Sequence, residues 1–463
     1  MKKILIFMFV VAIPFAVVDA QSNEFETATE AVKNMAVGWN LGNTLESNSG
    51  DTLNMWIEHW TNRTPSDYET AWGQPVTKAS LMKMFKEAGF NAIRVPVTWY
   101  PHMEAKFNFS SYNNSNWYPS KDNLGTKVDA AWMKRVKEVV DYVIDAGMYC
   151  ILNVHHDTGA SNTAWLVADE KVFEQQQARY EALWKQIAET FRDYDEHLLF
   201  ESYNEMLDVK DSWCFASFAV SYDAAIANSA YNGINNYAQS FVNVVRATGG
   251  NNAKRNLVVN TYGACNGEGN WNSHLLDPLK QMKLPNDIVQ NHLIFEVHSY
   301  PDIKNLSSAK STLVTNINNL KNYLVNKGAP VIFGEWGTST DKAYENYHSN
   351  MVAFYRYFVE QTKKAGMGTF HWMGLSEGEH RSKPEFNQQD LVDAIIKGYY
   401  GDEGYINGIQ YVETEKPKME SENAVYDLSG RKVSDGFSDY QPVNQLNLPK
   451  GIFIMNGRKY IVR

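Results

Sequence analysis

Short apolar or β-branched runs recur along the chain, and each is followed by a loop and a segment with helical periodicity. Eight such runs occur in succession and predict strands at Ala36–Leu41, Ala92–Val97, Tyr149–Val154, Leu198–Asn204, Asn256–Asn260, Leu293–Val297, Val331–Glu335 and Thr369–Trp372. The amphipathic stretches predict helices at Lys78–Ala88, Ala131–Ala146, Gln176–Phe191, Asn235–Ala247, Leu306–Val325, Tyr344–Ala365 and Gln389–Tyr400. Eight alternating units indicate an α/β fold, a closed parallel (β/α)8 TIM barrel, although a large open doubly wound sheet shows similar local signals.

Two further sequence features bear on this choice of fold. Gly89, Gly147 and Gly366 each follow a predicted helix directly, where glycine ends a helix and turns the chain toward the next strand. No Gly-x-Gly-x-x-Gly follows the first predicted strand, which argues against an open dinucleotide-binding sheet.

The composition changes after residue 400. Gly404–Asn423 is polar and rich in Glu and Lys, and Ala424–Arg463 predicts three short strands with turns at residues 428–430, 449–451 and 456–457. We therefore expect three regions: a signal peptide at 1–20, a barrel domain at 21–402, and a linker with a small β-rich C-terminal domain at 403–463.

The first twenty residues have the pattern of a secretory signal. Met1-Lys-Lys3 precedes the apolar run Ile4–Val18, and the small-residue end Val18-Asp-Ala20 follows. The run is short for a membrane span and is broken by Pro14, so an uncleaved anchor is the weaker alternative. We expect a secreted protein, extracellular or at the cell surface.

Composition narrows the range of partners. The chain has 463 residues, 44% of them hydrophobic, and a formal net charge of −10. An acidic surface repels nucleic acid and anionic membranes, so a neutral substrate is the expected partner, bound by a monomer without a cofactor. The three cysteines have no metal-ligand spacing. Cys150 reads as a small buried hydrophobe, and a Cys214–Cys265 bridge stays open.

Two predicted strands deliver a glutamate near the C-terminal end, where a (β/α)8 barrel keeps its catalytic groups. These residues are Glu205, after Leu198–Asn204, and Glu335, at the end of Val331–Glu335. A retaining glycosidase needs an acid and a nucleophilic carboxylate roughly 5 to 5.5 Å apart. We predict that Glu205 is the general acid/base and Glu335 the nucleophile. Arg94, inside an apolar strand, needs an anionic partner and is expected to contact Glu335.

Other polar residues end the same strands. His155 and His156 follow the third strand, His298 and Tyr300 follow the sixth, and Asn204 precedes Glu205. Tyr300 is expected to hydrogen-bond Glu335, Asn204 to hold a sugar 2-hydroxyl, and the histidines to bind hydroxyls or polarise Glu205. Metal ligation by the three histidines is the alternative, which lacks a carboxylate at fixed spacing.

Aromatic side chains stack on the apolar faces of sugars. Trp372, at the end of the eighth strand, is the favoured platform. The other candidates, for which a core position is the more common outcome, are Trp39, Trp72, Trp99, Trp165 and Trp336.

Taken together, seven linked motifs resemble glycoside hydrolase family 5, the cellulase family within clan A, from about residue 30 to residue 400. They are Gly38-Trp-Asn-Leu-Gly-Asn-Thr44, Ile93-Arg-Val-Pro-Val97, Leu152-Asn-Val-His-His156, Tyr203-Asn-Glu205, Glu296-Val-His-Ser-Tyr300, Phe333-Gly-Glu-Trp336 and Phe370-His-Trp372. The resemblance implies a retaining barrel hydrolase in which Glu205 and Glu335 react. The sugar-binding residues it implies are Arg94, His155, Asn204, His298, Tyr300 and Trp372. We predict that His156 and Asn43 also bind the substrate. Met206-Leu-Asp208 departs from the family pattern, in which many members have Pro after the glutamate.

The C-terminal segment has a resemblance of its own. Val425–Val433 and Leu448–Ile454 are similar to sorting domains of type IX secretion. For the whole chain we expect a secreted endo-β-1,4-glucanase that cleaves cellulose, carboxymethylcellulose or mixed-linkage β-glucan. Mannanase, xylanase and xyloglucanase are the alternatives within the family. A non-catalytic carbohydrate-binding barrel is the alternative from another class, and the presence of both glutamates argues against it.

Overall fold

The computed structural model describes residues 25–50, 55–103, 125–160, 163–210, 222–269, 272–338 and 346–402, together with seven short strands beyond them. The predicted leader at 1–20 and Cys214 lie outside the described residues. Within that part of the chain, no helix combines the length and the apolar character that a membrane crossing requires.

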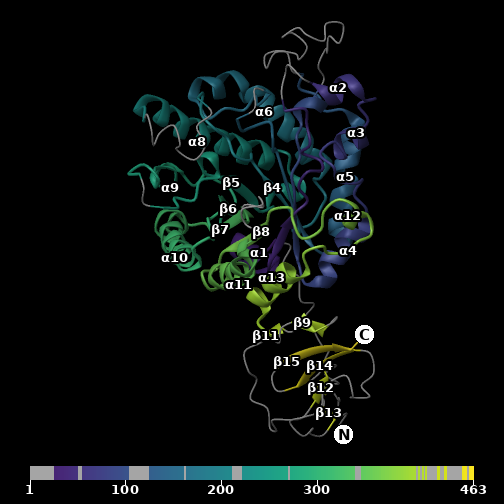
Figure 1. Cartoon of the computed structure of the whole chain (residues 1–463). Helices are drawn as coiled ribbons and strands as arrows, with labels where there is room; N and C mark the ends of the chain where they lie inside the picture. The colour runs from purple at the N-terminus through teal and green to yellow at the C-terminus, as the bar shows by residue number, and fades with distance from the viewer. Residues whose placement is uncertain are drawn as a thin grey trace, which may run out of the picture.

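Eight strands close into a parallel barrel in chain order, with β1 paired to both β2 and β8 (Figure 1). The strands are β1 Gly38–Asn40, β2 Ala92–Val95, β3 Tyr149–Asn153, β4 Leu198–Glu201, β5 Leu257–Asn260, β6 Leu293–Ser299, β7 Val331–Trp336 and β8 Gly368–His371. This confirms the (β/α)8 prediction and each of the eight strand positions. The ends shift by up to three residues because pairing with the neighbours, not apolar character, sets where each strand stops.

The helices surround the barrel (Figure 1). They are α1 Ala28–Met35, α2 Trp56–Trp60, α3 Pro65–Glu69, α4 Ala79–Ala88, α5 Ala130–Asp145, α6 Glu170–Thr190, α8 Ala224–Ala247, α9 Asp277–Gln281, α10 Leu306–Tyr323, α11 His348–Lys364, α12 Glu379–Ser382 and α13 Gln389–Tyr400. All seven predicted helices are present. Gly89, Gly147 and Gly366 all have the positive φ that ends a helix at low steric cost, as expected.

The apolar core has two parts. One lies between the outer faces of the strands and the helices. The other fills the lower lumen with side chains from alternate strand positions: Ile151, Leu199, Val258, Ile294, Ile332 and Phe370. Ala28, Val32 and Met35 of α1 pack against this second cluster, so α1 closes the base of the barrel. The polar chemistry is therefore confined to the upper lumen.

The C-terminal strands form sheets separate from the barrel (Figure 1). Five of them make an antiparallel sheet in the order β11 Val412–Glu413, β15 Arg458–Val462, β14 Gly451–Met455, β12 Val425–Asp427 and β13 Lys432–Ser434. β9 Tyr405–Ile406 pairs with β10 Ile409–Gln410. The expectation of three strands after residue 424 was wrong, since the described residues there already include four. The expected linker also contains strand residues, because a two-residue strand leaves no readable alternation.

Candidate active site

Strand alternation brings a second, polar layer of side chains into the upper lumen, directly above the apolar one. Arg94 of β2, Glu201 of β4 and Glu296 of β6 lie there, and all three side chains are fully buried. A buried charge is tolerated only when it is paired and hydrogen-bonded, so this layer has to be read as one network.

Arg94 is the centre of that network. Its Nε and Nη2 donate to the two carboxylate oxygens of Glu201 at 2.6 and 2.8 Å. Its Nη1 donates to Glu335 Oε1 at 2.8 Å, and its Nε lies 3.3 Å from Glu296 Oε1. The expected contact with Glu335 is present, but the two-pronged partner is Glu201, which the sequence analysis did not single out.

Glu335, on β7, lies in an environment that favours the ionised form. Tyr300 donates its hydroxyl to Oε2 at 2.7 Å, and Arg94 holds Oε1. Burial acts to raise the pKa of Glu335, but the positive charges of His298 and Arg94, with these two hydrogen bonds, outweigh it and hold the pKa below the usual value. A carboxylate that is ionised at neutral pH suits a nucleophile.

Glu205 lies in the opposite environment. β4 ends at Glu201, so the expectation that a strand reaches Asn204 was wrong, and Glu205 is carried by the loop. His298 Nδ1 lies 2.7 Å from Glu205 Oε1. Burial raises the pKa of Glu205, and the hydrogen bond and charge of His298 offset only part of that rise. A carboxylic acid that keeps its proton suits a general acid.

The two glutamates are close enough to act on one sugar. An oxygen of Glu205, an oxygen of Glu335 and a ring nitrogen of His298 all lie within 4.8 Å of one another. This separation fits the roughly 5 to 5.5 Å of retaining glycosidases and is too short for the roughly 6.5 to 9.5 Å of inverting ones.

The same three groups also have the spacing of metal ligands. However, both nitrogens of His298 face carboxylates, with Glu296 Oε1 3.2 Å from Nε2, and Glu335 is already held by Arg94. These carboxylates raise the pKa of His298 to about 10 against the effect of burial, so the ring is a cation at neutral pH. A charged imidazole does not ligate a metal, and the donor set therefore does not fit a metal ion.

Three more predicted residues lie around the pair. Asn204 Oδ1 accepts from Arg94 Nη2 at 2.8 Å, so the Asn204 amide is oriented by the arginine. His155 Nε2 lies 3.9 Å from Glu335 Oε1, and burial holds the pKa of His155 well below its usual value, so its ring is neutral. The rings of Trp372 and His155 are parallel, with centroids 5.8 Å apart.

His156 and Asn43 lie farther from the pair. The His156 ring contacts His155 edge-on, with centroids 4.5 Å apart, and Trp72, with centroids 5.4 Å apart, so it links Trp72 to the ring beside Glu335. Asn43 has φ 57° and donates its backbone N–H to the buried carboxylate of Glu46. No contact joins the Asn43 side chain to the glutamates within the described ranges.

Most of the other tryptophan candidates belong to the core. Trp372 and Trp72 are partly exposed, whereas four are fully buried: Trp39, Trp99, Trp165 and Trp336. Cys150 is likewise buried in β3, as expected for a small hydrophobe.

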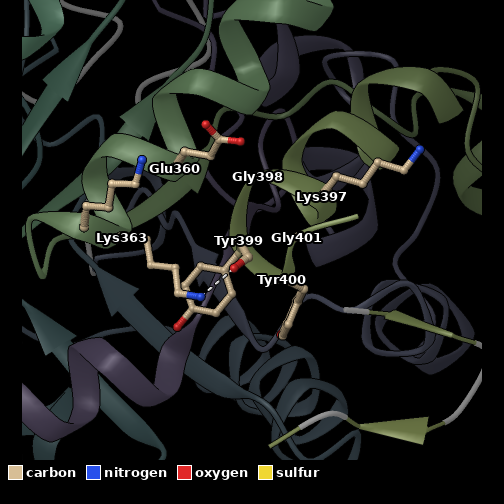
Figure 2. A pocket seen from close by; sticks show the side chains of 8 residues that line it. Glu360, Lys363, Lys397, Gly398, Tyr399, Tyr400 and Gly401 are labelled. Carbon is tan, nitrogen blue, oxygen red and sulfur yellow. Dashed lines mark hydrogen bonds between the residues drawn. The ribbon is translucent and has the colours of Figure 1, made fainter. Parts of the chain in front are cut away.

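A cavity of about 460 Å³ lies elsewhere, between α11 and α13 (Figure 2). Glu360, Lys363, Lys397 and Tyr399 line it, and the lysine Nζ of Lys363 donates to the Tyr399 carbonyl at 2.6 Å. It contains neither glutamate of the pair and no second carboxyl beside Glu360. The chemistry therefore belongs to the upper lumen, not to this cavity.

A (β/α)8 barrel with two close glutamates whose pKa values are shifted in opposite directions is the active site of a glycoside hydrolase. The family model for cellulase, glycosyl hydrolase family 5, matches residues 57–376, and the chain belongs to this family.

Relatives of known activity and structure are consistent with this. The chain is 30% identical to endoglucanase B of Neocallimastix patriciarum over 83% of its own length and 74% of the relative's. It is 53% identical to the solved structure of a GH5-4 broad-specificity endoglucanase from an uncultured bacterium, with a TM-score of 0.73 over 82% of this chain and 97% of the other. It is 37% identical to a family 5 enzyme from Prevotella bryantii solved with a xyloglucan tetradecasaccharide, with a TM-score of 0.68 over 81% and 99% of the two chains.

Proposed function

We propose that this protein is a retaining endo-β-1,4-glucanase of broad specificity, which hydrolyses internal β-1,4 bonds of cellulose or mixed-linkage β-glucan. One observation carries the proposal: the oxygens of Glu205 and Glu335 lie within 4.8 Å, while the two pKa values are shifted in opposite directions. The choice of a glucan rests on the endoglucanase relatives.

In this proposal Glu335 attacks the anomeric carbon, and a bond forms between that carbon and the carboxylate while the glycosidic bond breaks. Glu205 gives its proton to the departing oxygen. Glu205, now ionised, then takes a proton from a water molecule, whose oxygen displaces Glu335 and releases the sugar with its original anomeric configuration.

The neighbouring residues have defined parts in this reaction. Arg94 and Tyr300 stabilise the Glu335 carboxylate before and after attack through their hydrogen bonds. Asn204, oriented by Arg94, offers its amide N–H to the sugar 2-hydroxyl. Trp372 offers the apolar face on which the sugar stacks, and neutral His155 supports that ring.

A substrate panel tests this function. Reducing-sugar release would be measured on carboxymethylcellulose, lichenan, xyloglucan, glucomannan, galactomannan and xylan, and the anomer of the first product would be followed by NMR. We expect β-glucans to be cleaved with retention. An inverted product, or activity confined to mannan or xylan, would contradict the proposal.

Xyloglucan is a second candidate substrate, favoured by the likeness to the Prevotella bryantii enzyme that was solved with it. A branched chain needs room beside the cleft. A higher kcat/KM on xyloglucan than on unbranched lichenan would assign the protein to xyloglucan, and the reverse ratio would leave it a general β-glucanase.

We further propose that the protein is exported, with residues 1–20 as the cleaved signal and residues 403–463 as a sorting domain. The charged and apolar pattern of the leader supports the first part. The second part is supported by the sequence likeness of the tail and by its forming sheets outside the barrel. Cell fractionation and N-terminal sequencing of the exported protein test both, and a mature chain that begins at Met1 would contradict the cleavage.

A further inference from the structure

Strand β6 carries two polar side chains into the lumen, one above the other. Glu296 and His298 are two residues apart, so they project from the same face of the strand. Glu296 is fully buried beneath the floor of the site. Its Oε1 lies 3.2 Å from His298 Nε2 and 3.3 Å from Arg94 Nε.

The neighbouring strand leaves room for this carboxyl. β7 has glycine at position 334, directly before Glu335, and a Cβ built there would lie 1.6 Å from Glu296 Oε1. Any larger residue would therefore displace the Glu296 carboxyl. Glycine at 334 and glutamate at 296 are thus one packing unit beneath the catalytic pair.

His298 is held from both sides by this arrangement. Its Nε2 faces Glu296 below, and its Nδ1 faces Glu205 Oε1 above at 2.7 Å and Glu335 Oε2 at 3.5 Å. A ring that lost the lower contact would be free to tilt, and its Nδ1 would no longer be aimed at the glutamates.

We propose that Glu296 is a positioning residue for the reaction: its Oε1, fixed by Arg94, accepts from His298 Nε2 and aims Nδ1 of the same ring at Glu205. The inference rests on the proposed function, since it gives Glu296 a part in orienting the acid/base. Glu296 is fully buried, and its partners among the described residues are His298 and Arg94. It therefore acts through His298 and does not touch the sugar.

The second oxygen, Oε2, has no hydrogen-bond partner among the described residues. Burial raises the pKa of Glu296 to about 8, with the negative charge of Glu201 adding to the rise. Glu296 therefore keeps a proton at neutral pH, and its Oε1 serves as a neutral acceptor. The neighbour of Glu296 on β5 is Asn260, whose amide atoms also lack hydrogen-bond partners among the described residues.

The groups that face His298 come from several strands, and each affects its charge. Glu205 belongs to the loop after β4, Glu296 to β6 and Glu335 to β7, and all three favour the cation. His155 of β3 is neutral, and Arg94 of β2 is paired with Glu335 in the same network. Tyr300, on the segment after β6, donates its hydroxyl to Glu335.

The test compares Glu296→Gln, which keeps an acceptor of the same size, with Glu296→Leu, which removes it. Ile294→Ala, two residues earlier on the same face, is the control for a weakened lumen. kcat and KM would be measured on an aryl cellobioside, and the His298 ring would be titrated by NMR in histidine-labelled protein. His298→Asn identifies its resonance.

We expect Glu296→Leu to lose roughly 10- to 100-fold in kcat, since misplacement of a reacting group by a remote change costs that much. KM should stay within about twofold, because the sugar does not touch position 296. The His298 pKa should fall in Glu296→Leu. Glu296→Gln should keep most of kcat near pH 6, and Ile294→Ala should keep the wild-type kcat.

Equal losses in the Gln and Leu variants, or an unchanged His298 titration in Glu296→Leu, would overturn the proposal. Should Glu296→Leu not fold, Gly334→Ala supplies the same test, because it pushes the carboxyl away without removing it. The His298 titration needs no substrate. A wild-type protein inactive on every glucan would thus refute the proposed function while leaving the contact between Glu296 and His298 testable.

Discussion

Glu205 and Glu335 face each other with oxygens within 4.8 Å, and yet their pKa values are shifted in opposite directions. Two carboxyls this close cannot both ionise freely, and the surrounding charges decide which keeps the proton. Arg94 and Tyr300 donate hydrogen bonds to Glu335, which also lies 3.5 Å from His298, whereas the hydrogen-bond partner of Glu205 among the described residues is His298. The network around Arg94 therefore assigns the chemical roles.

The first prediction concerns these two roles. Glu335→Ala should lose nearly all activity on every substrate, because no carboxylate remains to form the glycosyl bond. Glu205→Ala should behave differently on an aryl glycoside whose leaving group needs no acid. Its first step should survive better than its second, and azide should restore turnover and give a β-azide product. Steady-state and burst kinetics measure both.

Glu335→Ala is the control for the azide rescue of Glu205→Ala. Added azide should give an α-azide or nothing in Glu335→Ala, since no covalent intermediate precedes it. Equal collapse of both variants without azide rescue would count heavily against the assigned roles.

The second prediction concerns Arg94. Arg94→Lys should lower kcat sharply, because a single ammonium cannot replace contacts that reach Glu201, Glu335 and Glu296 at once. A weaker cation beside Glu335 raises its pKa, so the acidic limb of the pH–rate profile should move to higher pH. The measurement is kcat/KM against pH.

Arg135 provides the matched control for this change. It also grips a glutamate with two nitrogens, donating to Glu69 at 2.9 and 2.8 Å, but on the helical layer outside the barrel. Arg135→Lys should leave the pH–rate profile in place. An unchanged acidic limb in Arg94→Lys would assign Arg94 to structure alone.

Much of this site was predictable from residue patterns, because strand periodicity and the polar residues at strand ends are local signals. Arg94 lies inside an apolar run, which predicts an anionic partner, and the predicted contact with Glu335 is present. The eight strands were predictable because each apolar run is short and is bounded by polar residues or glycine.

What the sequence did not reveal depends on contacts between strands. Glu201 lies in Leu-Leu-Phe-Glu at the end of an apolar run, and only the folded barrel brings it to Arg94 of β2. Glu296 was missed for a similar reason, because its space is provided by a glycine on another strand. A charged residue inside a predicted buried strand is the signal that identifies both.

The third prediction separates a sugar platform from a core tryptophan. Trp372→Ala should lower kcat/KM by roughly 10- to 100-fold, which corresponds to about 1.4 to 2.7 kcal/mol, because both ring stacking and buried apolar area are lost, while the Tm changes little. Trp336 is buried and stacks on Phe358 with centroids 4.3 Å apart. Trp336→Ala should instead cost about 3 to 5 kcal/mol of stability. Calorimetry and kinetics on cellotetraose together distinguish the two, and equal Tm losses would contradict the assignment of Trp372.

The fourth prediction concerns stability in acid. His371 is buried beside Trp336, both its ring nitrogens lack partners among the described residues, and burial lowers its pKa from 6.5 to about 3. In the unfolded chain the ring gains a proton below its ordinary pKa, while the folded ring stays neutral. Between pH 6.5 and about 3, therefore, the unfolded chain binds a proton at His371 that the folded chain does not bind. The free energy of unfolding is unaffected by this ring above pH 6.5, and it falls by up to about 1.4 kcal/mol per pH unit as the pH drops toward about 3.

Urea unfolding of wild type and His371→Leu at pH 7, 5 and 4 measures this effect. The difference in unfolding free energy should shift in favour of the variant as pH falls. His197 is a control of opposite sign, because a hydrogen bond from its ring to Asp195 raises its pKa. Its contribution is present below pH 6.5 and is lost as pH rises through the raised value, so His197→Leu should cost more at pH 5 than at pH 7. Parallel stability curves for wild type and His371→Leu would refute the account.

The fifth prediction concerns the C-terminal sheets. α13 ends at Tyr400, and Arg356 holds Asp402 with two hydrogen bonds at 2.9 and 3.1 Å. Among the described residues, none of those that surround the glutamate pair lies beyond residue 402. A chain that stops after Asp402 keeps the catalytic network and the Arg356–Asp402 pair, so its specific activity on soluble β-glucan and its Tm should match those of the full chain. The native host should fail to deliver it to the surface or medium, which fractionation would show. A shortened protein that aggregates, or that loses most of its activity, would mean instead that the C-terminal strands are part of the barrel's fold.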